Sequence, residues 1–115
     1  MNEAKQLTDF LAGMGAALKL DAGLPLSVIA ILIVIARENA VGRGCTVKEA
    51  ARILQLPETS VFRGFQRLAG GSKGSRNVGE GLGMIYYEPD PLESRRHLAF
   101  VSEVGRAFIA AFCRF

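Results

Sequence analysis

The side chains of this sequence that could take part in specific chemistry are concentrated between Pro57 and Ala69. The guanidinium of Arg63 can bind a planar pair of acceptors through two parallel hydrogen bonds, and the amide of Gln66 can donate and accept at once. These groups suit the binding of phosphates or of the polar edges of bases. The segment therefore has the chemistry of a binding surface, although a solvated helix face would also carry such residues.

The chain offers no set of residues from which a catalytic or metal site could be assembled. The single histidine, His97, has no cysteine or second histidine near it in the sequence, and the two cysteines, Cys45 and Cys113, form no Cys-x-x-Cys pair. We therefore expect no enzyme activity, no metal and no cofactor. Both cysteines are expected to be buried, reduced thiols, since a redox switch would need an exposed thiol of low pKa.

Two short helices are expected to position the binding residues. Residues 46–49, Thr-Val-Lys-Glu, form a capping-box pattern at the start of the first helix, in which the threonine hydroxyl and the glutamate carboxylate cap each other's backbone amides. Pro57 suits the first position of the second helix, and Val61, Phe65 and Leu68 give that helix an apolar inward face. Two helices joined by so short a break predict a helix-turn-helix.

The remaining elements are expected to surround this pair. Apolar periodicity predicts helices over residues 3–20 and 26–40, and Ser102 can cap a last helix. Cys45 is predicted to add a short strand residue before the capping box. Strands are predicted over residues 84–88 and 97–101, joined by a charged turn over 89–96, while the glycine-rich stretch 69–83 is predicted to be a loop. The order is that of a winged helix: mainly α, with a small β-hairpin wing.

Charge and hydropathy limit the function classes. The net charge is only +3, but residues 61–115 carry eight basic and five acidic side chains, whereas residues 1–60 carry six of each. An excess confined to one part of the chain is typical of a polyanion-binding face. The mean hydropathy of +0.24 is high for a small chain and favours a buried subunit interface. The apolar run 24–36 is too short to span a membrane, which takes roughly 20 apolar residues.

Two stretches of the chain together resemble the MarR family of winged helix regulators. They are TVKEAARILQLPETSVFRGFQRLA, similar to the family's helix-turn-helix, and ESRRHLAFVSEVGRAF, similar to its wing and the following capped helix. Glu93-x-Arg95 stands where the family usually has Asp-x-Arg. Phe62 departs from the family, which commonly has a small hydroxylated residue there. The loop after residue 70 is also longer than the family's usual link to the wing.

The resemblance implies a homodimeric, sequence-specific double-stranded DNA-binding protein, most simply a transcriptional regulator. The helix at about 57–69 would enter the major groove, and the wing at about 88–97 would reach the backbone or the minor groove. Arg95 and Arg96 could instead pair with Asp90 and Glu93 in the hairpin, and both roles are compatible. The expected DNA-binding residues are Thr59, Ser60, Phe62, Arg63, Gln66, Arg67, Lys73, Arg76, Arg95 and Arg96.

We expect one domain, in which residues 1–22 form a dimerisation helix, 24–102 the winged helix core and 103–115 a C-terminal helix. The absence of a visible targeting signal predicts a cytoplasmic protein, bacterial or phage-encoded, and no residue set supports a small-molecule effector. The expected dimerisation residues are the apolar side chains of the two terminal helices, Leu7, Phe10, Leu11, Met14, Leu18, Phe108 and Phe112.

Two alternatives remain open at this stage. An exposed Phe62 and the modest net charge would also suit a winged helix that serves as a protein-interaction or assembly module. Within DNA binding, a replication or partition protein of a phage or plasmid would have the same sequence features.

Overall fold

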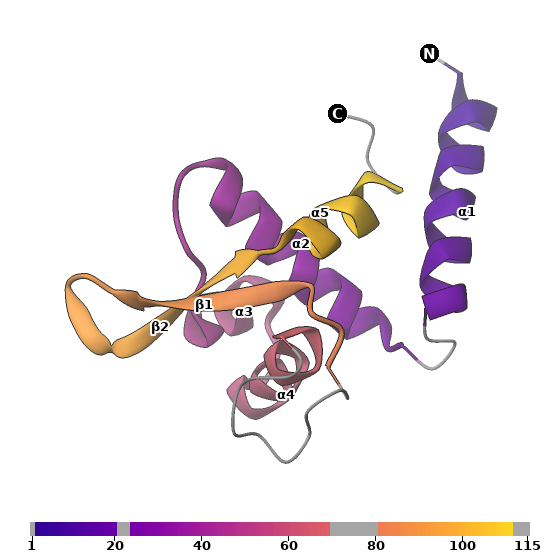
Figure 1. Cartoon of the computed structure of the whole chain (residues 1–115). Coiled ribbons are helices and arrows are strands. Elements are labelled where there is room, and N and C mark those ends of the chain that lie inside the picture. Colours follow the sequence, from indigo (N-terminus) through magenta and orange to yellow (C-terminus); the bar gives the residue numbers. More distant parts are fainter. Residues whose placement is uncertain (1, 21–23, 70–80, 112–115) are drawn as a thin grey trace.

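The computed structural model describes residues 2–20, 24–69 and 81–111 of the chain. In Figure 1 the β-hairpin extends to one side of the molecule, α4 lies below it, and α1 stands at the end opposite the hairpin tip. The elements in chain order are α1 Glu3–Leu20, α2 Leu26–Ala40, α3 Val47–Leu54, α4 Glu58–Ala69, β1 Ile85–Asp90, β2 Glu93–Val101 and α5 Glu103–Ala110. Within the described residues, five helices and a two-stranded antiparallel hairpin make a mainly helical winged helix, as predicted.

Helix α2 is the centre of the core. It is apolar around most of its circumference, which is typical of a helix covered on several sides, and it contacts α3, α4, α5 and β2. Ile31, Leu32 and Ile35 are almost completely buried. Helix α4 packs closely on α2 at Gly64, where an added Cβ would lie 2.5 Å from Cδ1 of Ile31. This contact fixes the orientation of α4 and therefore of its exposed face.

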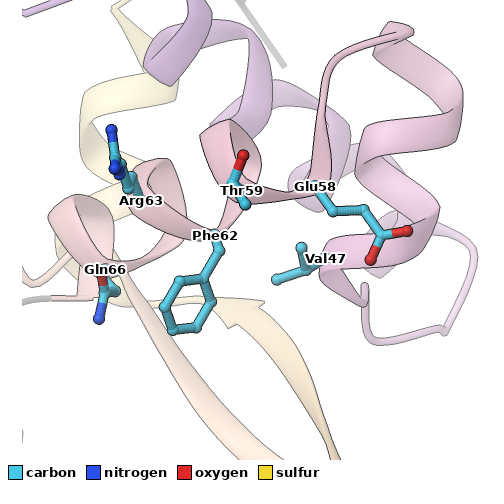
Figure 2. A pocket seen from close by; sticks show the side chains of 6 residues that line it. All are labelled: Val47, Glu58, Thr59, Phe62, Arg63 and Gln66. Carbon is cyan, nitrogen blue, oxygen red and sulfur yellow. The ribbon is translucent and has the colours of Figure 1, made fainter.

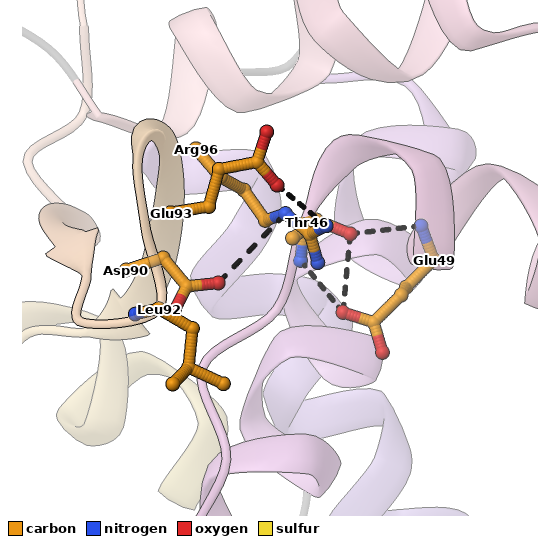
Figure 3. A network of polar contacts seen from close by, with 6 residues as sticks. All are labelled: Thr46, Glu49, Asp90, Leu92, Glu93 and Arg96. Carbon is orange, nitrogen blue, oxygen red and sulfur yellow. Dashed lines mark hydrogen bonds and ion pairs between the residues drawn. The ribbon is translucent and has the colours of Figure 1, made fainter.

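The predicted capping box at the start of α3 is confirmed (Figure 3). The Glu49 amide donates to the Thr46 hydroxyl at 3.1 Å, and the Thr46 amide donates to Oε1 of Glu49 at 3.3 Å. At the other end of α3, Gln55 adopts a left-handed conformation with φ of 56°. That conformation ends the helix and turns the chain toward Pro57, so that α4 begins only a few residues later.

The hairpin is longer than the sequence pattern predicted. We expected strands over 84–88 and 97–101 with a turn over 89–96, but pairing runs from Ile85 opposite Val101 to Asp90 opposite Glu93. Only residues 91–92 form the turn. The prediction was wrong because it followed apolar alternation, whereas backbone pairing continues into a projecting hairpin whose side chains meet water. Pro89 is tolerated because the ladder becomes irregular next to it.

The base of the hairpin is held by hydrogen bonds to two distant segments. Cys45 pairs with Ala99 through two backbone hydrogen bonds of 3.1 and 2.8 Å, which confirms the short strand residue predicted there. Ser102 caps α5 as predicted, accepting from the Gly105 amide at 3.2 Å. The Ser102 hydroxyl also donates to the carbonyl of Gly83 at 2.6 Å. Strand β2 therefore leads directly into α5, and the hydrogen bonds of Ser102 hold the first turn of that helix in place.

Helix α1 has the bounds predicted from its periodicity and contacts α5. Its apolar side chains are mostly exposed: Leu7, Phe10, Leu11 and Leu18 each present more than half of their surface to solvent. Within the described ranges, no helix combines the length and the apolar character needed to cross a membrane.

Candidate nucleic-acid interface

Helix α4 has two chemically distinct faces. Its buried side chains and its buried glycine follow a helical period and pack on the core. The opposite face is exposed and holds Glu58, Thr59, Ser60, Phe62, Arg63 and Gln66. This division agrees with the prediction for all of these residues. Arg67 differs in degree, because it is half-buried rather than fully on the exposed face, and it has interactions of its own within the fold.

The exposed face of α4 is hollowed next to α3. An open depression of about 500 Å³ is lined by Val47 of α3 together with five residues of α4. Figure 2 shows the Phe62 ring projecting from α4 between Gln66 and Val47. Phe62 is 52% exposed although it has the largest apolar side chain on this face. Polar and charged groups therefore surround an apolar centre.

The two wing arginines have different surroundings. Arg96 is engaged in the hairpin tip, where Nη2 lies 3.1 Å from Oε2 of Glu93 and Nε lies 3.8 Å from Oδ2 of Asp90 (Figure 3). This confirms for Arg96 the pairing considered from the sequence. Arg95 is exposed, and no ion pair to it is found in the described part of the chain. Of the two, Arg95 offers the guanidinium that is not already paired.

Aromatic contacts fix the hairpin against α4. The rings of Phe65 and Tyr87 are stacked with centroids 6.5 Å apart, and His97 lies edge-on to Tyr87 at 6.3 Å. Burial raises the pKa of the Tyr87 hydroxyl above its ordinary value. Arg95 lies two residues before His97 in β2, in the part of the strand where the pairing with β1 is irregular. Strand β1 is thus packed against α4, on the side of the helix opposite its exposed face.

The prediction of a buried, reduced thiol is confirmed for Cys45. Cys113 lies outside the described residues. Cys45 is completely buried. Burial, with smaller contributions from Glu49 and Glu38, raises the pKa of its thiol to about 12. A thiol in this environment stays protonated near neutral pH. Among the described residues no three His, Cys, Asp or Glu side chains come together as a metal site would require.

The described residues of the expected dimerisation set lie on α1, which stands at the end of the molecule opposite the wing tip, and on α5 (Figure 1). Leu7, Phe10, Leu11 and Leu18 are exposed, while Met14 and Phe108 are half-buried and Phe108 packs against the core. Three predicted residues, Phe112 of the dimerisation set and Lys73 and Arg76 of the DNA-binding set, fall outside the described ranges.

Sequence reasoning missed two residues that shape the candidate DNA-binding surface of α4 and the wing. Val47 was considered only as part of the capping-box pattern, yet it is half-buried and lines the depression beside Phe62. Asn39, which orients the wing, was not singled out at all. Its partners in β2 are the carbonyl of Ala99 and the amide of Val101. No local pattern identifies its role in the wing, because the partners in β2 lie about sixty positions away.

Comparison with solved structures assigns this architecture to a known fold. A MarR family transcription regulator, SP03579, matches with a TM-score of 0.59 at 18% identity, covering 95% of this chain and 58% of that one. The regulator Tm0710 from Thermotoga maritima matches with a TM-score of 0.62 at 16% identity over 92% and 63%. The transcriptional repressor CouR, bound to a 23-mer DNA duplex, matches with a TM-score of 0.60 at 18% identity over 94% and 64%.

The chain has the MarR-like winged helix fold, as the sequence resemblance implied. The structural neighbours named here are transcription regulators, and this chain spans 58–64% of their length. No family model matches the sequence. No curated protein matches it either.

Proposed function

We propose that this protein is a homodimeric, sequence-specific double-stranded DNA-binding protein that regulates transcription. The observation that carries the proposal is the exposed face of α4, where Arg63 and Gln66 stand clear of the core on a helix fixed by the Gly64 contact. An α-helix fits the major groove of B-DNA, in which each base pair presents a distinct pattern of donors and acceptors. The fold shared with the repressor CouR, which is bound to a 23-mer DNA duplex, supports DNA as the partner.

The side chains of this face suit different parts of a duplex. Arg63 can bind O6 and N7 of a guanine, and Gln66 can bind N6 and N7 of an adenine. Thr59 and Ser60, exposed in the first turn of α4, suit phosphate contacts that set the register of the helix. Arg67 would then contribute mainly through its charge, since it is half-buried.

The wing supplies a second contact in this proposal. Arg95 is exposed on β2 and would reach the phosphate backbone or the adjacent minor groove. The ion pairs of Arg96 with Glu93 and Asp90 would hold the tip in position. In this proposal the hairpin holds the protein on the DNA backbone, and the side chains of α4 contact the bases.

In this proposal a second copy of the chain packs against the exposed apolar face of α1. Leu7, Leu11 and Leu18 are each exposed by more than half although α1 already contacts α5. A two-fold dimer through α1 and α5 would place two α4 helices in successive major grooves, about 34–36 Å apart, on a near-palindromic site.

Selection from a random duplex pool tests the function directly. Sequences enriched by the protein should contain two related half-sites, and Arg63→Ala should weaken binding to them by about 1–3 kcal/mol and relax specificity at one position. Arg106→Ala is the matched control, because it removes an exposed arginine from α5. Absence of any enriched sequence, or equal affinities of the Arg63 variant and the control, would contradict the proposal.

A protein-interaction module is the second candidate, and the exposure of Phe62 favours it. Large aromatic side chains are frequent anchors in protein interfaces. The two candidates differ at low salt, where a DNA-binding protein of this fold should bind even non-specific duplex. A protein that binds no duplex at low salt would be assigned to the second class.

A further inference from the structure

We propose that the depression between α3 and α4 reads the 5-methyl group of a thymine, with Phe62 as the residue that recognises it. This inference rests on the DNA-binding function proposed above and names what one part of that surface would select. It concerns the side chains that line the depression, Val47, Glu58, Thr59, Phe62, Arg63 and Gln66.

The first argument is chemical. The Phe62 ring and the Val47 side chain form the apolar part of a surface that is otherwise polar (Figure 2). In the major groove of B-DNA the thymine methyl is the one apolar group that a base pair presents, and the other groups are hydrogen-bond donors and acceptors. An apolar centre on a groove-facing helix therefore has one natural counterpart on the base pairs.

The second argument is positional. Thr59, Phe62 and Gln66 succeed one another at three- and four-residue spacing, so they lie along one face of α4. Phe62 thus lies on the same face of α4 as Gln66, whose amide can bind a base edge. A flat ring there can cover a methyl group without leaving a buried polar atom of the protein unpaired.

The flanking charges favour a duplex over a protein partner as the occupant. Arg63 borders the depression, and the other side chains that border it, apart from Glu58, are neutral. The nearby hairpin adds the exposed Arg95. The charges of Arg63 and Glu58 balance at the depression itself, so the positive charge that complements the phosphate backbone flanking every base pair comes from Arg95.

Replacing thymine by deoxyuridine isolates the methyl group, because uracil keeps the same hydrogen-bonding edge. Thymines in the selected duplex are replaced one at a time, and affinity is measured by fluorescence anisotropy. We expect one thymine in each half-site whose replacement weakens binding by about fourfold, the loss expected for one buried methyl group. Thymines outside the half-sites should show no effect.

Protein variants then assign the effect to Phe62. Phe62→Ala should bind the thymine and uracil duplexes equally, whereas Phe62→Leu, which keeps an apolar side chain, should retain part of the difference. Val41→Ala is the control, since it shortens an exposed apolar side chain in the turn after α2 and should leave the fourfold difference unchanged. Circular dichroism checks that each variant is folded.

The outcomes separate this inference from the function on which it rests. Sequence-specific binding that is indifferent to every thymine-to-uracil replacement, or a selected site without thymine, would overturn the role of Phe62 and leave the DNA-binding proposal standing. The same discrimination in Phe62→Ala as in the native protein would overturn it too. Failure to bind any duplex at low salt would overturn both.

Discussion

The side-chain carbonyl of Asn39, at the end of α2, accepts a hydrogen bond of 2.8 Å from the backbone amide of Val101, at the base of the wing. The amide nitrogen of the same side chain donates to the carbonyl of Arg43 at 2.8 Å and to that of Ala99 at 3.3 Å. One side chain therefore joins the central helix, the turn that follows it and strand β2. The direction in which the wing projects depends on this junction.

Asn39→Ala should lower the free energy of unfolding by about 1–3 kcal/mol, because the part-buried amide of Val101 loses its acceptor. Urea denaturation measures the change. Gln66→Ala is the control: this amide side chain is exposed, and its removal should change stability by no more than about 0.5 kcal/mol. Equal effects of the two substitutions would argue against a structural role for Asn39.

Gly105→Ala should destabilise the fold by about 1–3 kcal/mol through overpacking. A Cβ at this position would lie 2.7 Å from Cγ1 of Val101 and closer still to the backbone carbonyl of Met84, which cannot rotate away. Gly15→Ala is the matched control on α1, where an added Cβ meets nothing within 4 Å. The control should stabilise the protein by about 0.5–1 kcal/mol through better helix propensity. Thermal unfolding of both variants gives the comparison.

Arg95→Ala should weaken duplex binding to a similar degree on different sequences and should reduce the slope of log affinity against log salt by about 1. The reason is that a phosphate contact releases a counterion without reading a base. Titrations at several salt concentrations measure the slope, with Arg106→Ala as a control of equal charge. A slope unchanged by Arg95→Ala would remove the wing from the proposed interface.

Cys45 should resist alkylation by iodoacetamide in the folded protein and react once the protein is denatured. Its pKa is about 12 in the folded state, against an ordinary value of 9.0, because burial disfavours the thiolate. The Cys113→Ser variant leaves Cys45 as the remaining thiol, and mass spectrometry follows its modification. Rapid alkylation of the folded variant near pH 8 would contradict the burial of Cys45.

The same shift predicts a dependence of stability on alkaline pH. Between about pH 9 and pH 12 the unfolded chain loses the Cys45 proton while the folded chain keeps it, so the stability contributed below pH 9 is lost as the pH rises. Cys45→Ala removes this contribution, and the stability difference between the two proteins should narrow over that range. Urea denaturation at a series of pH values measures it.

The features that the sequence predicted are those with local causes. The capping box of Thr46 and Glu49 involves residues three positions apart, so the pattern of residue types is sufficient to identify it. The two faces of α4 follow from the spacing of Val61, Phe65 and Leu68, since a helix places residues three or four apart on one side. The cap of α5 by Ser102 is local in the same way.

The features that the sequence left undetermined depend on contacts between distant residues. Only the tertiary structure decided that the hairpin pairs as far as Asp90 and Glu93, because strand pairing is a property of two segments and not of either alone. It also decided that Arg96 is paired while Arg95 is exposed, and that Val47 completes the depression beside Phe62. Periodicity predicts which side of a helix is buried, whereas the neighbours on its exposed side depend on how the whole chain packs.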